Sequence, residues 1–326
     1  MGPPAPPAVI VHGVVPPVPD GVEGGVGEVA TLELPPPQLT PATTATASAV
    51  TSVPARRGVN LKQALTETLM RQTIRLFLLG ASVSAASIAS AQGAAPATGK
   101  DVLAKMRSTY AGAWYKTLTF RQTTTIRRPD GKDTVQTWYE MLRYTPERGT
   151  QLRIDVAPLE SGNASISTWD STWVVRVDTL AAVRAGGNPF LALIEGAYMQ
   201  PVTESIRQLA PLGFNLDKLR TADWNGTPVW VVGTTDATDS TSAQFWVEDK
   251  HLMVVRIILA NPGRAPLDIH LGALEKCGKG WLATRVEMFQ GGARRQAEDY
   301  HDWKCDVPID AGLFTPGAKG VKHWAR

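Results

Sequence analysis

Few residues in this sequence have the types and spacing that catalysis needs. His270 lies two residues after Asp268, and His301 stands next to Asp302, so each histidine could pair with a carboxylate. A serine from elsewhere in the chain could then complete a hydrolytic triad. The sequence contains no GxSxG or HExxH pattern, no Gly-rich phosphate loop and no EF-hand run. It therefore favours a protein that is not an enzyme, and a secreted hydrolase is the weaker alternative.

The two cysteines, Cys277 and Cys305, have a spacing that suggests a disulfide. If Gly291-Gly292 is the loop of a hairpin, Gln290 faces Ala293, and the cysteines then lie within one residue of opposite each other. A β-bulge could absorb that difference. We expect the cysteines to be bonded, and two free buried thiols are the alternative. Two cysteines and scattered histidines do not form a metal site, so we expect no metal and no cofactor.

The segment from Pro228 to Ala260 predicts three antiparallel strands, around which the other strands are arranged. Its runs of Val, Trp and Phe are separated by polar turns that are too short for a crossover helix. Asn225-Gly226, just before it, is a strong hairpin signal. Further strands are expected at residues 118–127, 134–144, 151–157, 164–168, 172–178, 219–224, 266–275, 281–290 and 293–304. About ten or eleven strands in this order predict a mainly β domain, as a sandwich, a barrel or a strongly curled open sheet.

Three short helices are expected beside these strands. Residues 99–110 place four apolar side chains at helical spacing. Residues 188–196 begin with an N-cap Asn and a Pro and end with a Gly, and residues 201–209 carry apolar side chains spaced by four and three. In the strand at 151–157, apolar residues alternate with Arg153 and Asp155, which predicts one buried and one exposed face.

The charge of the chain argues against nucleic acid as a partner. There are 33 basic and 30 acidic residues, a formal net charge of +3, and no basic block or arginine-rich helix. Binding to phosphates needs clustered Lys and Arg. The 10 tryptophans are more informative, since they predict either ordinary sheet packing or an aromatic-lined apolar cavity.

The chain divides into segments of different composition. Residues 1–69 are mostly Pro, Val, Ala, Gly and Thr without a sustained period, which predicts disorder or an upstream extension that does not belong to the protein. Residues 70–91 have two arginines, an apolar stretch and Ala89-Ser90-Ala91, the layout of a signal peptide cleaved after Ala91. A linker at 92–99, one domain at 100–316 and a tail at 317–326 follow. We therefore expect a periplasmic protein.

Several short pieces of the domain, taken in order, resemble one family of exported proteins. They are Phe120-Arg121-Gln122, then Gln244-Phe245-Trp246-Val247 followed by a polar turn and Val254-Val255-Arg256, and the closing Leu313-Phe314-Thr315-Pro316. With the opening helix and the mid-chain helices, they make residues 100–316 similar to the LolA/LolB-like periplasmic lipoprotein carriers, proteins that sort outer-membrane lipoproteins. The resemblance implies an incomplete antiparallel β-barrel, with helices as a lid over an apolar cavity for acyl chains. It also implies a non-catalytic carrier of lipids or acylated proteins, which has a membrane-associated donor or acceptor.

The resemblance also suggests residues for the site. Carriers of this family hold the lid with an arginine near the start of the strands, and Arg153 stands at about that place, although an ordinary outward-facing residue is the alternative. We expect the cavity to be lined by the aromatic residues Phe120, Trp138, Trp173, Phe190, Trp230 and Phe245. Burial of an acyl chain there would contribute about 0.8 kcal/mol per methylene. A periplasmic sensor or regulator, which binds a protein partner with the same half-barrel, is the alternative function.

Overall fold

The computed structural model describes residues 95–188 and 190–324 of the chain. The predicted upstream extension at 1–69 and the predicted signal peptide at 70–91 lie outside the described residues, as does the linker up to residue 94. In the described ranges, no helix is both long and apolar enough to cross a membrane.

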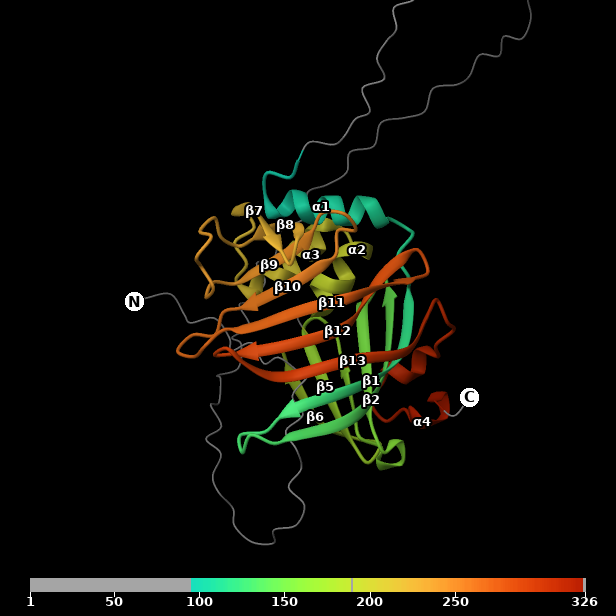
Figure 1. Ribbon diagram of the computed structural model, residues 1–326. Helices are drawn as coiled ribbons and strands as arrows, with labels where there is room; N and C mark the ends of the chain where they lie inside the picture. Colours follow the sequence, from blue (N-terminus) through green and yellow to red (C-terminus); the bar gives the residue numbers. More distant parts are fainter. Residues whose placement is uncertain (1–94, 189, 325–326) are drawn as a thin grey trace, which may run out of the picture. The chain divides into compact units, whose positions relative to one another are not determined.

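The strands form a single antiparallel sheet of 13 strands in the order β6-β5-β4-β3-β2-β1-β13-β12-β11-β10-β9-β8-β7 (Figure 1). Their bounds are β1 Thr117–Arg127, β2 Asp133–Thr145, β3 Gly149–Val156, β4 Ala164–Ser167, β5 Ser171–Arg176, β6 Thr179–Ala185, β7 Leu219–Trp224, β8 Thr227–Val232, β9 Gln244–Glu248, β10 Val254–Leu259, β11 Leu267–Cys277, β12 Gly280–Gln290 and β13 Ala293–Cys305. Because β6 and β7 are not paired with each other, the sheet is open. This confirms the predicted mainly β fold and its incomplete barrel.

The predicted total of ten or eleven strands was too low, although the ranges expected from the sequence correspond to twelve of the 13 strands. The segment that the sequence did not reveal is β6, an edge strand in which nearly every side chain is exposed. An exposed edge strand lacks the alternation of apolar and polar residues by which strands are recognised. The strands between Pro228 and Ala260 were better predicted. The three strands expected there are β8, β9 and β10.

Helix α1 spans Gly99–Tyr110, as predicted, and its start is fixed by a capping box. Thr98 Oγ1 accepts a hydrogen bond from the backbone N–H of Asp101 at 3.2 Å, and the Asp101 carboxylate accepts one from the N–H of Thr98 at 2.9 Å. The apolar stripe of the helix is buried in the main hydrophobic core. Figure 1 shows α1 next to α2 and α3.

The long connection between β6 and β7 joins the two edges of the open sheet. It contains a π-helical turn at Leu191–Gly196 (η2), α2 at Ala197–Met199, α3 at Val202–Leu209 and a 3-10 turn at Ala210–Leu212 (η3). The predicted helix at 201–209 is confirmed as α3. At the helix predicted for 188–196, Asn188 Oδ1 accepts the N–H of Phe190 at 2.9 Å, as expected of an N-cap, and the π-helical turn runs from Leu191 to Gly196. We call residues 191–209 the helical lid.

The strand β3 is buried on both faces, so the predicted exposed face was wrong. Leu152 and Ile154 face the helical lid, on what we call the inner face of the sheet, whereas Arg153 and Asp155 point to the outer face. That outer face is covered by the C-terminal segment, which contains a 3-10 turn at Ala311–Phe314 (η4) and α4 at Val321–Trp324. A 3-10 turn at Leu159–Ser161 (η1) completes the elements. The segment that covers Arg153 lies 160 positions later in the chain, so the sequence of β3 alone could not reveal this burial.

Cys277 and Cys305 form the predicted disulfide, with their Cα atoms 5.8 Å apart. The hairpin register is also as expected near the loop, since Gln290 pairs with Ala293. The cysteines, however, do not face each other across that hairpin. Cys277 ends β11 and pairs with Gly280 of β12, while Cys305 ends β13, so the bond joins the ends of two strands that flank β12.

Candidate ligand-binding cavity

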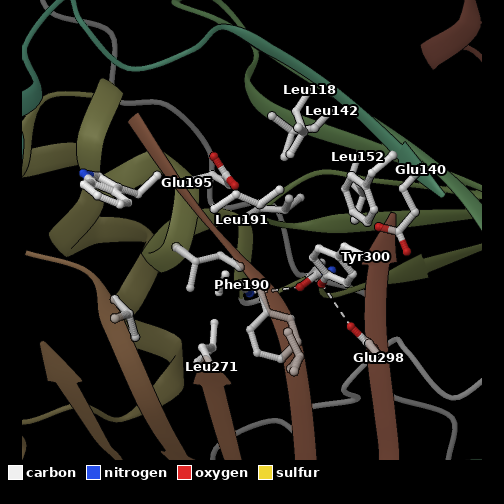
Figure 2. A pocket seen from close by; sticks show the side chains of 18 of the residues that line it. Leu118, Glu140, Leu142, Leu152, Phe190, Leu191, Glu195, Leu271, Glu298 and Tyr300 are labelled. Carbon is white, nitrogen blue, oxygen red and sulfur yellow. Dashed lines mark hydrogen bonds between the residues drawn. The ribbon is translucent and has the colours of Figure 1, made fainter. Parts of the chain in front are cut away.

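An apolar cavity lies between the inner face of the sheet and the helical lid (Figure 2). Strands β1, β2, β3, β10, β11, β12 and β13 all contribute to it, which requires the curl of the whole sheet. Most of its lining is aliphatic or aromatic, namely Tyr115, Leu118, Phe120, Trp138, Leu142, Leu152, Ile154, Phe190, Leu191, Ile194, Tyr198, Met253, Val254, Leu271, Trp281, Leu282, Ala283, Val286, Met288 and Tyr300. An apolar cavity with a few polar groups is the usual form of a small-molecule site.

The cavity is narrow in this conformation. It has a volume of about 80 Å³, measured as the space open to the centre of a water-sized sphere. Pockets for drug-sized ligands usually measure roughly 300–1,000 Å³. A ligand of that size therefore requires the cavity to widen.

The helical lid is tied to the rest of the domain through Glu195. Its carboxyl accepts hydrogen bonds from Trp114 Nε1 at 3.0 Å and from the Tyr115 hydroxyl at 2.9 Å, both in the segment between α1 and β1. Burial raises the pKa of Glu195 to about 7, although these two hydrogen bonds favour the charged form. Tyr198, one helical turn further, stacks on Trp114 and donates to the carbonyl of Leu252 at 2.9 Å. These polar contacts hold the lid together with its apolar side chains, among them Leu193 and Leu209, which are buried in the main hydrophobic core.

Two further carboxyl groups, Glu140 and Glu298, line the cavity from the sheet. Figure 2 shows them on strands at one side of the cavity, with Tyr300 beside Glu298. Tyr300 stacks on Phe120, the residue that pairs with Glu140, so one aromatic pair lies between the two acids. Burial raises the pKa of Glu298 to about 7. Burial and then the neighbouring Glu298 hold the pKa of Glu140 well above its usual range.

The hydrogen-bond acceptors around these acids outnumber the donors. Glu298 accepts from Gln296 Nε2 at 2.5 Å and from the Tyr300 hydroxyl at 3.0 Å. The buried carbonyl oxygens of Gln122 and Gln296 have no hydrogen-bond partner among the described residues. None of the hydrogen bonds in the described part of the chain reaches the Glu140 carboxyl, whose residue is 5% exposed. No Lys, Arg or His is among the described residues that line the cavity.

The predicted aromatic residues fall into two groups. Phe120, Trp138 and Phe190 line the cavity. Trp173 lies in the outer-face cluster with Ile166 and the C-terminal segment. Phe245 packs edge to face on Phe214, away from the cavity lining, and Trp230 carries Lys105 of α1 over its ring at 5.1 Å. The structure therefore brings three of the six expected residues together around one space.

Arg153 lies on the outer face of β3 and does not reach the helical lid. Its guanidinium makes hydrogen bonds of 2.7 to 3.0 Å to the Asp155 carboxylate and one of 2.8 Å to the carbonyl of Leu313. Arg153 is 1% exposed, so it is also not the ordinary outward-facing residue of the alternative hypothesis. Its contacts hold the C-terminal segment instead of the lid.

The three acids of the cavity were missed by sequence reasoning, although a signal was present. Glu140 alternates with Trp138 and Leu142 along β2, so the register places all three on the inner face. A glutamate at an inner position of such a strand is rare unless it is paired or functional.

The two histidines that could have belonged to a hydrolytic triad have other neighbours. His270 lies beside Asp268 and Trp224, and His301 contacts Thr123 Oγ1. Within residues 95–188 and 190–324, neither histidine is hydrogen-bonded to a serine. The same residues contain no cluster of three potential metal ligands.

Comparisons with known proteins give only distant structural similarity. No protein-family model and no curated protein sequence matches this chain. It is similar to the crystal structure of a DUF1329 family protein from Desulfovibrio piger, with 15% identity, a TM-score of 0.47, and coverage of 68% of this chain and 97% of that chain.

Two further structures have similar scores. One is a putative outer membrane lipoprotein-sorting protein domain from Vibrio parahaemolyticus, with 13% identity, a TM-score of 0.45, and coverage of 65% of this chain and 94% of that chain. The other is a LolA superfamily protein from Nitrosomonas europaea, with 11% identity, a TM-score of 0.45, and coverage of 68% of this chain and 98% of that chain. At such identities and TM-scores these structures say nothing about the ligand of this chain, which its own cavity must define.

Proposed function

We propose that this protein is an exported, non-catalytic carrier that holds the apolar chain of a lipid or an acylated protein in the cavity beneath the helical lid. The observation that carries the proposal is the cavity itself, an apolar space between a curled sheet and a short helical segment. Each buried methylene of a ligand chain contributes about 0.8 kcal/mol. A chain of moderate length can thus offset the contacts that the lid loses when it moves.

Two features of the described residues support this function. The lid is held by hydrogen bonds, including those of Glu195 and Tyr198, and by apolar packing, but it is not hydrogen-bonded into the sheet as a strand, so opening it does not require the strands to separate. The disulfide between Cys277 and Cys305 is of the kind found in oxidising compartments, which favours action outside the cytoplasm. A membrane-associated donor or acceptor belongs to the same proposal.

Binding of a fluorescent, uncharged alkyl probe tests the proposal. The variant Ala283→Phe adds a ring at a cavity position, and Val183→Phe makes a related enlargement on the exposed strand β6. We expect one probe per protein, at least a tenfold weaker affinity for Ala283→Phe, and no change for Val183→Phe. Near-UV circular dichroism establishes that both variants keep their packing. A probe that fails to bind, or binds equally to both variants, would contradict the proposal.

A protein partner is the alternative, because the same half-barrel could serve as a sensor or regulator. Val177 in the turn before β6, with Leu180 and Val183 of β6, forms an exposed apolar surface of the kind that favours this function. Mass spectrometry of lipids that co-purify with residues 92–326, exported through the natural leader, distinguishes the two. Stoichiometric acyl species support the carrier, whereas an empty protein favours the partner.

A further inference from the structure

The inner face of the sheet carries a polar patch that a purely apolar ligand does not explain. We define it as the acidic patch, formed by Gln122 of β1, Glu140 of β2 and Gln296, Glu298 and Tyr300 of β13. These strands are adjacent, and Gln122 pairs with Tyr300 across β1 and β13. A carrier of hydrocarbon chains alone would gain stability from apolar residues at these positions, because buried polar groups without partners cost free energy.

The acidic patch has fewer hydrogen-bond donors than acceptors, and none of the described residues that line the cavity carries a positive charge. Two glutamine carbonyl oxygens, in residues that are 1% exposed, have no donor in the described part of the chain. Glu140, which lines the cavity, has no hydrogen bond there either. The other titratable groups that face the cavity are Glu195 from the lid and the tyrosines Tyr115, Tyr198 and Tyr300, so no neighbouring element brings a cation.

We propose that the cavity binds an amphiphile whose polar end is an N–H cation, such as a primary alkylamine, held at the acidic patch while its chain lies along the apolar lining. An ammonium group carries one positive charge and three N–H donors. It would supply the acidic patch with both donors and a positive charge. This inference rests on the proposed function, because it names the ligand class for the same cavity.

The protonation of the acids agrees with this ligand. Burial favours the neutral form of both carboxyl groups, since it raises the pKa of Glu298 to about 7 and holds that of Glu140 well above its usual range. A bound cation stabilises the carboxylates, so binding releases protons. The affinity for an amine should therefore rise as the pH increases through 7, as long as the amine itself stays protonated.

Isothermal titration calorimetry with dodecylamine, dodecanol and dodecanoate tests the inference. We expect dodecylamine to bind at least tenfold more tightly than either chain-matched ligand at pH 8. We expect the double variant Glu140→Gln/Glu298→Gln to lose that preference. The control Glu147→Gln/Glu275→Gln, which changes two exposed glutamates, should keep it.

A second measurement uses the unmodified protein, so it does not depend on the folding of a variant. Titrations at pH 7 in buffers of different ionisation enthalpy should show the release of about one proton when dodecylamine binds, and none when dodecanol binds. Equal affinities for all three ligands, or a preference for dodecanoate, would overturn the inference while the carrier function stands. If none of the three binds, the proposed function fails and the inference fails with it.

Discussion

The two faces of the sheet differ in whether their buried charged residues are paired with residues of opposite charge. On the outer face, Arg153 and Asp155 are paired, and their remaining hydrogen-bonding atoms contact Leu313 and Trp324 of the C-terminal segment. On the inner face, Glu140 and Glu298 lie in a cavity whose described lining residues include no Lys, Arg or His. The strands involved are neighbours, and β2 and β3 contribute to both faces. The difference therefore arises from what covers each face.

This contrast distinguishes buried charged residues that stabilise the fold from buried acids that we expect to bind a ligand. A buried ion pair whose hydrogen bonds are all satisfied fixes one arrangement of the chain, here the path of the C-terminal segment over β3. Buried acids without a partner destabilise the empty protein and gain from a ligand that supplies the partner. We expect mutations on the outer face to affect folding and mutations in the acidic patch to affect binding and pH dependence.

The largest expected effect is the loss of Arg153. Arg153→Met leaves the Asp155 carboxylate buried with only Trp324 as a donor, so we expect the free energy of unfolding to fall by about 3–5 kcal/mol. The double variant Arg153→Met/Asp155→Leu removes both charges and should recover most of that loss. Urea denaturation at pH 7 measures both. A loss below about 1 kcal/mol in the single variant would show that the pair does not hold the outer face.

The next effect concerns the pH dependence of stability. The pKa of Glu298 rises from 4.5 to about 7 on folding, so the folded state keeps a proton that the unfolded state has already released. The resulting stabilisation is complete below pH 4.5 and is lost as the pH rises through 7. Glu298→Gln stays neutral, and it should flatten this slope by on the order of 1–3 kcal/mol between pH 5 and pH 8.

Denaturation of both proteins at the two pH values tests this expectation. Glu147→Gln, an exposed change of the same kind, is the matched control and should keep the slope of the unmodified protein. Parallel stability curves for Glu298→Gln and the unmodified protein would mean that Glu298 is charged in the folded state. The contrast between the two faces would then not hold.

The smallest expected effect sharpens the role of the C-terminal segment. Trp324 Nε1 donates to Asp155 Oδ2 at 3.2 Å, and Trp324→Phe removes this donor while it keeps an aromatic ring. We expect a loss of about 1 kcal/mol in the free energy of unfolding, typical of one hydrogen bond. The exposed pair Arg121 and Asp302 is the control, since Asp302→Asn should cost less than about 0.5 kcal/mol. A Trp324→Phe variant as stable as this control would show that the last turn contributes little.

Much of the fold could be predicted because it depends on local patterns. The bounds of α1, the three strands from Pro228 to Ala260 and the register at Gln290 and Ala293 follow from periodicity, capping and turn residues. The disulfide was predicted correctly, although from a hairpin geometry in which Cys277 was placed on the wrong strand. The apolar residues Phe120, Trp138 and Phe190 were also expected around a cavity, and they line it.

By itself, the sequence determined most of the strands and helices and the aliphatic character of one sheet face, because these depend on residues close in the chain. Only the tertiary structure decided which polar residues are buried. Arg153 is enclosed by a segment 160 residues later, and Glu140 lies in a cavity closed by the lid residue Glu195. The physical reason is that burial and the pKa of a side chain depend on everything packed around it. Those neighbours come from the folding of the whole sheet.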